Sequence, residues 1–219
     1  PYIPGSSLKG KMRSLCERMR GFDPDNPKQT QKIGNIRIHV CKDPDQYAKC
    51  DVCQVFGLSG EIEHSYPTRL VVRDVFLHDE SLKGADTDFP FTEVKWEATI
   101  DRITSAALPR QVERVPSGAI FKDFEMIHSL YDLGGEQDEE VNRLTTLFKA
   151  MQLLEDDYLG GLGSRGSGKI KFENIRLGLR KDTQLLSCPN LDRADLHKLI
   201  SQEKTVISWV REELANAKE

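Results

Sequence analysis

Hydrophobic residues recur at helical spacing in two long stretches of the chain, 5–21 and 137–158. An apolar face repeated every three or four residues predicts an amphipathic helix that packs on a core. Pro4 and Gly21 bracket the first stretch, and acidic residues begin the second, where the helix dipole favours negative charge. The apolar faces comprise Leu8, Met12, Leu15, Met19 and Phe22 in the first stretch and Val141, Leu144, Phe148, Met151 and Leu154 in the second.

Three shorter stretches, 67–78, 118–131 and 169–177, are rich in β-branched and aromatic residues and predict strands. Between the first two, residues 79–117 contain two alternating runs joined by small residues, which predict a protruding hairpin. A third amphipathic helix is expected over 192–217, with Asp192 as its cap.

This order of elements becomes βαββαβ if one further strand precedes Pro4, which is the ferredoxin-like, RRM-like arrangement of the α+β class. The chain begins with Pro1 rather than Met, so we expect the first strand to lie upstream. The expected organisation is one RRM-like domain over 1–191 and a C-terminal amphipathic helix over 192–219. Two inserts interrupt the domain, at 23–66 and at 79–117.

Composition restricts the function only weakly. The 219 residues carry a net charge of −4, so any case for nucleic acid must come from local clusters of bases. No apolar run is long enough to cross a membrane, so no membrane contact is expected, and no signal peptide is visible. The cysteines are clustered as for a metal rather than for disulfides, which predicts a reducing cytoplasm.

Three of the five cysteines fall between residues 41 and 53, which favours a metal site over a disulfide framework. The Cys50-x2-Cys53 spacing lets two thiolates reach one tetrahedral ion, and His39 and Cys41 can complete the set. We therefore expect structural zinc rather than free thiols or a redox pair, with His64 as the competing fourth ligand. With every position filled by protein, this zinc would not be catalytic.

The stretch 160–169 holds five glycines, two serines and two bases. Successive free N–H groups of such a loop can cradle an anion, and the bases would close over a phosphate. A long turn between helix and strand is the alternative. The preceding pair Asp156 and Asp157 is interpreted as a solvated helix end.

The first helix adds a second candidate phosphate site. Its Gly-Ser-Ser start offers N–H groups, hydroxyls and a positive dipole end, and bases follow. A capped helix with a solvated basic face is the alternative. In the hairpin region, the bases and Trp96 could lie along an RNA strand. A surface hairpin with paired Arg and Glu is the alternative.

Four blocks of sequence carry a family resemblance. They are Ile3-Pro4-Gly5-Ser6-Ser7-Leu8-Lys9-Gly10-Lys11-Met12-Arg13, Pro109-Arg110-Gln111-Val112-Glu113-Arg114, Asp157-Tyr158-Leu159-Gly160-Gly161 and Gly163-Ser164-Arg165-Gly166-Ser167-Gly168. In this order they resemble the Csm-type backbone subunit of type III CRISPR effector complexes, which belongs to the RAMP superfamily. The resemblance spans about residues 2–180, and four blocks in order are more specific than any one of them.

The resemblance implies that copies of the subunit stack along a guide (CRISPR) RNA, beside other subunits of the complex, and cut a paired target RNA at regular intervals. The hairpin would be a thumb that wedges into the guide–target duplex. The cleavage would use a divalent metal such as Mg²⁺ and an acidic residue upstream of Pro1, so no catalytic residue is expected in this chain. The expected RNA-binding residues are Ser6, Ser7, Lys9, Lys11, Arg13, Arg102, Arg110, Arg114, Gly163, Ser164, Arg165, Gly166 and Lys169.

Two other functions remain open at this point. A guide-processing ribonuclease of the same superfamily would act alone and would need a general base such as His near the scissile phosphate, but the five histidines are scattered. A non-catalytic, zinc-containing interaction domain would need no RNA.

Overall fold

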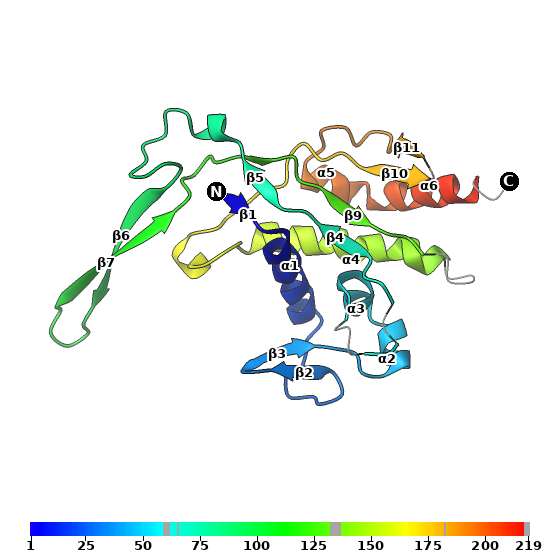
Figure 1. The fold of residues 1–219 in the computed structure, drawn as a ribbon, viewed down its shortest axis with the longest axis horizontal. Coiled ribbons are helices and arrows are strands. Elements are labelled where there is room, and N and C mark those ends of the chain that lie inside the picture. The colour runs from blue at the N-terminus through cyan, green and yellow to red at the C-terminus, as the bar shows by residue number, and fades with distance from the viewer. Residues whose placement is uncertain (59–61, 65, 132–136, 182, 217–219) are drawn as a thin grey trace. The chain divides into compact units, whose positions relative to one another are not determined.

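The structure is a computed structural model that describes residues 1–58, 62–64, 66–131, 137–181 and 183–216. The chain forms two compact units, of which one comprises Pro1–Ser6 and Arg73–Glu125 and the other Ser7–Val72 and Met126–Glu219. Helices are mixed with small antiparallel sheets, as Figure 1 shows.

The smaller unit contains a three-stranded antiparallel sheet in the order β1-β5-β8 and a long hairpin, β6–β7. The hairpin register runs from Glu93 opposite Arg114 to Ile100 opposite Ala107, which confirms the hairpin expected in this part of the chain. The elements are β1 (Tyr2–Ile3), β5 (Val75–Leu77), the 3-10 helix η1 (Asp79–Leu82), β6 (Glu93–Ile100), β7 (Ala107–Arg114) and β8 (Phe121–Lys122).

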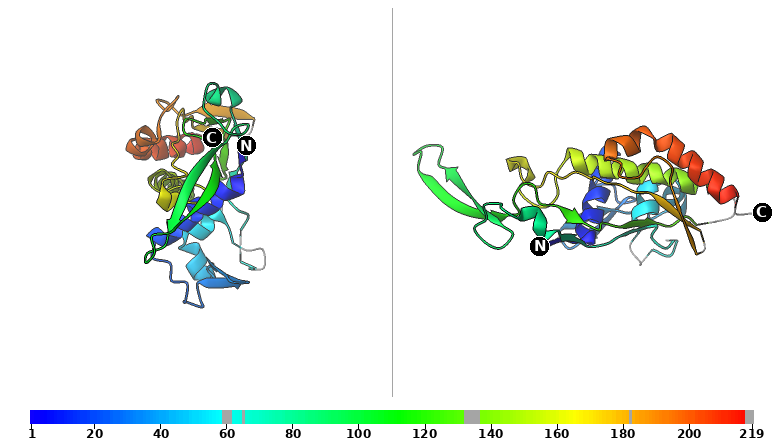
Figure 2. Two further views of the ribbon diagram at one scale, coloured as in Figure 1. Left: turned by 90° about the vertical axis from the view of Figure 1, so that its left-hand side faces the viewer. Right: turned by 90° about the horizontal axis from the view of Figure 1, so that it is seen from above.

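The larger unit is built around helix α4 (Gln137–Asp156), whose predicted apolar face is buried. Both views in Figure 2 show α6 (Glu203–Ala215) lying alongside α4, and the two helices pack together. Helix α3 (Asp51–Phe56) also packs against α4. The other helices are α1 (Gly5–Met19, whose first two residues belong to the smaller unit), α2 (Pro44–Ala48), α5 (Leu196–Ser201) and the 3-10 turn η2 (Gly163–Arg165).

Among its described residues, the larger unit also contains three separate antiparallel strand pairs: β2–β3, β4–β9 and β10–β11. Their bounds are β2 (Thr30–Ile33), β3 (Ile36–His39), β4 (Leu70–Val72), β9 (Met126–His128), β10 (Gly178–Lys181) and β11 (Gln184–Ser187).

A buried ionic network joins the residue before β4 to α4. Arg69 makes two hydrogen bonds to the Glu140 carboxylate, at 2.6 and 2.7 Å, and Arg143 pairs with the same carboxylate. Arg69 also donates to the carbonyl of Gln54 at 3.2 Å. Charges buried this deeply are tolerated only when each is paired and hydrogen-bonded.

The structure corrects several expected elements. The strand predicted over 67–78 is two strands, β4 and β5, which pair in different sheets, and the one predicted over 118–131 is likewise divided into β8 and β9. Residues 169–177 form no strand; Ile175 makes only an isolated bridge with Ala194.

The C-terminal helix is also divided. It consists of α5 and α6, which meet at Gln202, and Asp195 rather than Asp192 caps α5 by accepting from the N–H of Lys198 at 2.7 Å. Residues 217–219 lie outside the described part of the chain.

Candidate metal centre and glycine-rich loop

Four candidate metal ligands converge in the segment between α1 and β4. His39 ends strand β3, Cys41 follows two residues later, and Cys50 and Cys53 occupy the cap and the first turn of α3. A spacing of three residues at a helix start places both thiols on the same side of the helix. The turns between β3 and α3 therefore bring the end of the strand and the start of the helix together.

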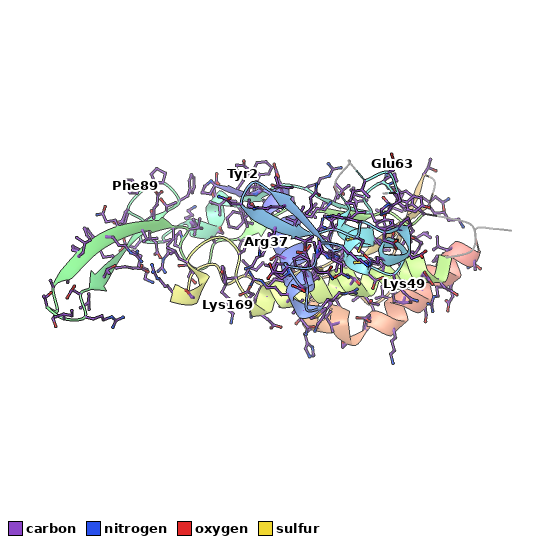
Figure 3. All side chains as sticks on the ribbon, turned by 90° about the horizontal axis from the view of Figure 1, so that it is seen from below. Tyr2, Arg37, Lys49, Glu63, Phe89 and Lys169 are labelled. Atoms are coloured by element: carbon purple, nitrogen blue, oxygen red, sulfur yellow. The ribbon has the colours of Figure 1, made fainter. Side chains whose placement is uncertain are left out.

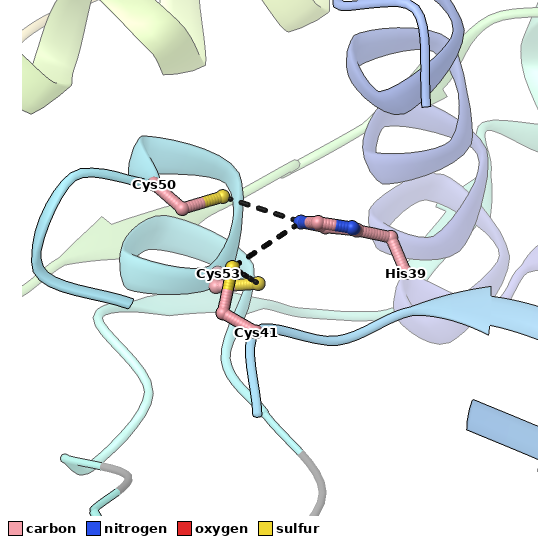
Figure 4. A group of neighbouring side chains, drawn as sticks. All are labelled: His39, Cys41, Cys50 and Cys53. Atoms are coloured by element: carbon pink, nitrogen blue, oxygen red, sulfur yellow. Dashed lines mark hydrogen bonds between the residues drawn. The ribbon is translucent and has the colours of Figure 1, made fainter. Parts of the chain in front are cut away.

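The ligand atoms of these four residues all lie within 4.8 Å of one another. His39 Nε2 is 3.3 Å from Cys50 Sγ and 3.5 Å from Cys41 Sγ, and the Sγ atoms of Cys41 and Cys53 are 3.7 Å apart. Figure 4 shows the imidazole directed at the thiols. Tetrahedral ligands at zinc bond lengths would lie roughly 3.3–3.8 Å apart, so the donor set fits such an ion.

The chemistry of the cluster also suits a metal. Hydrogen bonds from the thiols of Cys41 and Cys53 lower the pKa of the Cys50 thiol, which favours the thiolate that metals bind. All five cysteines of the chain are free, so none of these sulfurs is used in a disulfide. The cluster His39, Cys41, Cys50 and Cys53 could therefore bind a metal such as zinc.

His64, the competing ligand, lies beside the cluster rather than in it. Its Nε2 is 3.1 Å from the carbonyl oxygen of Cys41, and its ring packs edge-on against Tyr47 at 5.6 Å. The imidazole that faces the thiols is that of His39.

The glycine-rich loop is a closed turn that follows α4. The N–H of Leu159 donates to the carbonyl of Gly168 at 2.8 Å and closes the base of the loop. Leu162 and Gly166, with φ values of 60° and 85°, flank the turn η2 in the left-handed region. At Gly168, with φ +82°, an added Cβ would lie 2.1 Å from the carbonyl oxygen of Leu159, so only glycine fits there.

Tyr158 lies beneath this loop and is held by helix α1. A Cβ added at Gly163 would meet the Tyr158 ring at 2.0 Å. The ammonium of Lys11 lies 3.8 Å from the centre of the same ring and 2.8 Å from Asp157 Oδ2. Asp157 is thus a partly buried ion-pair partner rather than a merely solvated residue, whereas Asp156, at the end of α4, is exposed as expected.

The predicted anion-contacting side of the loop faces solvent. Ser164, Arg165, Gly166 and Lys169 are exposed, and Gly163 is half-buried; Figure 3 labels Lys169. An exposed backbone turn with two bases has the chemistry needed to bind phosphate.

The start of α1 is occupied by a carboxylate. Ser6 and Ser7 are exposed, and the N–H of Gly5, in the first turn, donates to Asp74 Oδ1 at 2.8 Å. Asp74 therefore supplies negative charge at the helix start, where a phosphate was expected.

The bases of α1 have partners within the chain. Lys9 donates to the carbonyl of Leu70 at 2.7 Å, and burial lowers its pKa. Arg13 donates to the carbonyls of Gly57 and His39 at 2.8 and 2.9 Å and to Glu17 at 2.8 Å. RNA contacts by Lys9, Lys11 and Arg13 stay predictions.

The hairpin bases are arranged across the two strands. Arg110 pairs with Glu97 at 2.7 Å and Arg114 with Glu93 at 2.5 Å, while Arg102 is exposed in the turn. The ion pairs follow from the register, which places Arg and Glu opposite one another.

Sequence reasoning missed the residues that support these sites: Tyr158 under the loop, and Arg13 and Phe22 beside the metal cluster. Phe22 packs edge-on against the His39 ring at 5.0 Å. A signal existed only for Tyr158, an aromatic residue two positions before Gly160 in one of the blocks that carry the family resemblance.

Comparison with known proteins agrees with the resemblance. The family model described as the RAMP superfamily matches residues 1–171. A protein of Methanocaldococcus jannaschii named "CRISPR system Cms endoribonuclease Csm3" is 40% identical over 178 residues, which cover 80% of this chain and 64% of that protein. Proteins of the same name from Methanothermobacter thermautotrophicus and Streptococcus thermophilus are 40% and 39% identical, with 81% and 80% of this chain and 69% and 70% of theirs covered.

The chain thus spans about two thirds of the length of these relatives. Among the described residues, no helix combines the length and the apolar character that crossing a membrane requires. The family match covers most of the chain, and the relatives agree with it. This chain belongs to the RAMP superfamily.

Proposed function

We propose that this chain is a guide RNA-binding backbone subunit of a type III CRISPR effector complex. It stacks with copies of itself along guide RNA in the cytoplasm, beside other subunits, and takes part in cleavage of a paired target RNA at regular intervals. The relatives' printed name, a CRISPR endoribonuclease, supports this function.

One observation carries the proposal: Lys11 of α1 contacts Asp157 and Tyr158, directly before a loop whose bases are exposed. In the sequence, the helix and the loop lie about 150 residues apart, yet this contact places them side by side. Backbone phosphates of RNA are the ligand that such a loop suits, because the contacts ignore base identity. Guide pairing then supplies the sequence specificity.

The proposed contacts to guide RNA are those expected from the sequence. Gly163, Ser164, Arg165, Gly166 and Lys169 would bind phosphates from the loop. Ser6, Ser7, Lys9, Lys11 and Arg13 would do so from α1, and Lys11 would then exchange Asp157 for a phosphate. Arg102, Arg110 and Arg114 would lie along the duplex from the hairpin, which we assign as the thumb.

We further propose that the fold is the ferredoxin-like, RRM-like core over 1–191, with a zinc-binding insert, the thumb and the helical segment 192–219. Helices α1 and α4 would be the two helices of this core. Zinc at His39, Cys41, Cys50 and Cys53 would be structural, since four protein ligands leave no open position. Target cleavage would use a separate divalent ion such as Mg²⁺.

Native mass spectrometry with guide-like RNAs of stepped length tests this function. We expect the number of bound copies to rise with RNA length, because each copy covers a fixed number of nucleotides. A fixed single copy on every RNA would instead favour a ribonuclease that acts alone. No bound RNA at any length would favour the interaction domain.

A shortened hairpin, lacking residues 95–110, sharpens the test. Guide binding is expected to persist, since the loop and α1 are intact, while the spacing of target cleavage is disturbed in the assembled complex. Loss of guide binding in this variant would show that the thumb assignment is wrong.

A further inference from the structure

Arg13 joins helix α1 to both ends of the ligand-bearing segment. Its guanidinium donates to the carbonyl of His39, a candidate ligand, and to the carbonyl of Gly57, directly after α3. All four candidate ligands lie at or between these two carbonyls in the sequence. The planar fork of an arginine can hold two such acceptors at fixed positions, whereas a lysine cannot.

On the side of the His39 ring away from the thiols, packing takes the place of a hydrogen bond. Its Nε2 faces the thiols, and within the described residues its buried Nδ1 has no hydrogen-bond partner. Phe22, just beyond α1, packs against this ring at 5.0 Å. A metal-bound histidine commonly donates its second N–H to a carboxylate or carbonyl. Here, besides the thiols at Nε2, the Phe22 ring contacts the His39 ring and Arg13 holds its backbone carbonyl.

A third contact ties α1 to the same segment. Arg20 pairs with Asp51 at 2.8 Å, and Asp51 directly follows the ligand Cys50. The residues just after α1 therefore contact His39 through Phe22, and the neighbour of Cys50 through Arg20.

We propose that Arg13 is the positioning residue of the metal centre, and that through it metal occupancy fixes α1 and the glycine-rich loop. Lys11, which holds Asp157 and Tyr158, lies two residues from Arg13, about 3 Å along a helix axis. Bound metal orders the ligand segment and so fixes the two carbonyls that Arg13 grips. The effect on RNA rests on the proposed function; the effects on metal and loop do not.

Zinc release from the full chain tests the first step. The zinc-loaded protein is mixed with a chromophoric chelator, and Arg13→Gln is compared with Arg18→Gln, a change of an exposed base on the same helix. Loss of an outer-shell partner typically costs about 10- to 100-fold in metal affinity, so we expect Arg13→Gln to release zinc at least about 10-fold faster. Arg18→Gln should match the wild type.

Arg13→Lys is a second variant, for use if Arg13→Gln fails to fold. It keeps the positive charge but lacks the planar guanidinium that holds both carbonyls. Arg13→Lys should release zinc at a rate between those of the wild type and Arg13→Gln. If Arg13→Gln does not fold, Arg13→Lys should still release zinc faster than the wild type. Wild-type release rates in the folded Arg13 variants would overturn the proposal.

Hydrogen exchange tests the second step without RNA. Stripping zinc from the wild type should speed amide exchange in α1 and in 160–168, and Arg13→Gln should show the faster exchange even when loaded. Unchanged exchange in 160–168 after stripping would overturn the coupling to the loop. Labelled single-stranded RNA then gives a separate result: no binding in any state defeats the proposed function, while the zinc and exchange results still decide the role of Arg13.

Discussion

The candidate metal centre and the glycine-rich loop are built differently. In the metal centre, four ligand side chains from the end of β3 and the start of α3 converge within 4.8 Å of one another. In the loop, the backbone itself packs on one ring, that of Tyr158. Helix α1 anchors both regions, through Arg13 and through Lys11. In our proposal the first region depends on a bound ion for its order, whereas the second depends on the absence of side chains at its glycines. The two should therefore respond to different perturbations.

The largest expected effect is the loss of a metal ligand. Cys50→Ser should lower bound zinc well below one per chain and destabilise the larger unit by about 4 kcal/mol or more, because metal binding contributes directly to folding. Metal analysis and thermal unfolding measure both quantities. Cys188→Ser is the matched control, since this buried free cysteine lies outside the cluster.

An equal loss of stability and of bound zinc in Cys188→Ser and Cys50→Ser would mean that the cluster binds no stabilising metal. Chelation of zinc from the wild type should reproduce the effect of Cys50→Ser and leave the ion-paired hairpin β6–β7 unchanged.

Protonation of His128 changes the free energy of unfolding without acting on either region, so its effect has to be measured separately. Burial lowers the pKa of His128 to about 4; nearby Glu140 opposes this shift and Arg69 and Arg143 add to it. The unfolded chain, with the ordinary histidine value, binds the proton first as the pH falls. This group's contribution is therefore complete above about pH 6.5 and is lost towards pH 4, by up to about 3 kcal/mol.

Unfolding of the zinc-stripped protein between pH 4 and 7 measures the contribution of His128, because it removes metal release from the comparison. His128→Leu should flatten the profile in this range. An unchanged slope in that variant would assign the pH dependence to other groups.

The steric fit of the loop is tested by one added methyl group. Gly163→Ala would place a Cβ at 2.0 Å from the Tyr158 ring, so the ring or the loop must move, at a cost of about 2 kcal/mol. Gly161→Ala is the control, since its Cβ would meet nothing within 4 Å. Zinc content should stay the same in both, and unfolding curves that coincide for the two variants would show that Tyr158 does not hold the loop.

The smallest expected effect concerns Lys11. Lys11→Met removes a partly exposed ion pair and a cation–π contact, each of which contributes modestly, so the expected loss is about 1 kcal/mol. Lys83→Met, at an exposed pair, should cost less than about 0.5 kcal/mol. If Lys83→Met lowered the free energy of unfolding more than Lys11→Met does, the assignment of Lys11 as the anchor of the loop would be wrong.

The regions also differ in how far the sequence predicts them. Cys50 and Cys53 have a spacing typical of metal sites, and His39 and Cys41 are near enough in sequence for the cluster to be expected. Helices α1 and α4 were predicted because their apolar periodicity is long. No elements were predicted within 23–60, because β2, β3, α2 and α3 are too short to carry a hydrophobic period.

What the sequence could not predict depends on contacts between distant residues. Asp157 looks like any helix end until Lys11 is placed beside it, and Arg13 looks like any surface base until the carbonyls of His39 and Gly57 face it. The predicted strands failed for a related reason: a run such as 67–78 does not reveal that β4 and β5 pair in different sheets.

The salt dependence of RNA binding tests most directly whether the glycine-rich loop binds an RNA backbone. The affinity of the zinc-loaded chain for a single-stranded RNA is measured at stepped salt concentrations for the wild type, Arg165→Glu and Arg176→Glu, a change at an exposed surface ion pair. A phosphate contact on single strands contributes a slope of about 0.7 in log affinity against log salt. We expect weaker binding and a slope flatter by at least that amount for Arg165→Glu alone. Equal affinity and slope in all three proteins would contradict it.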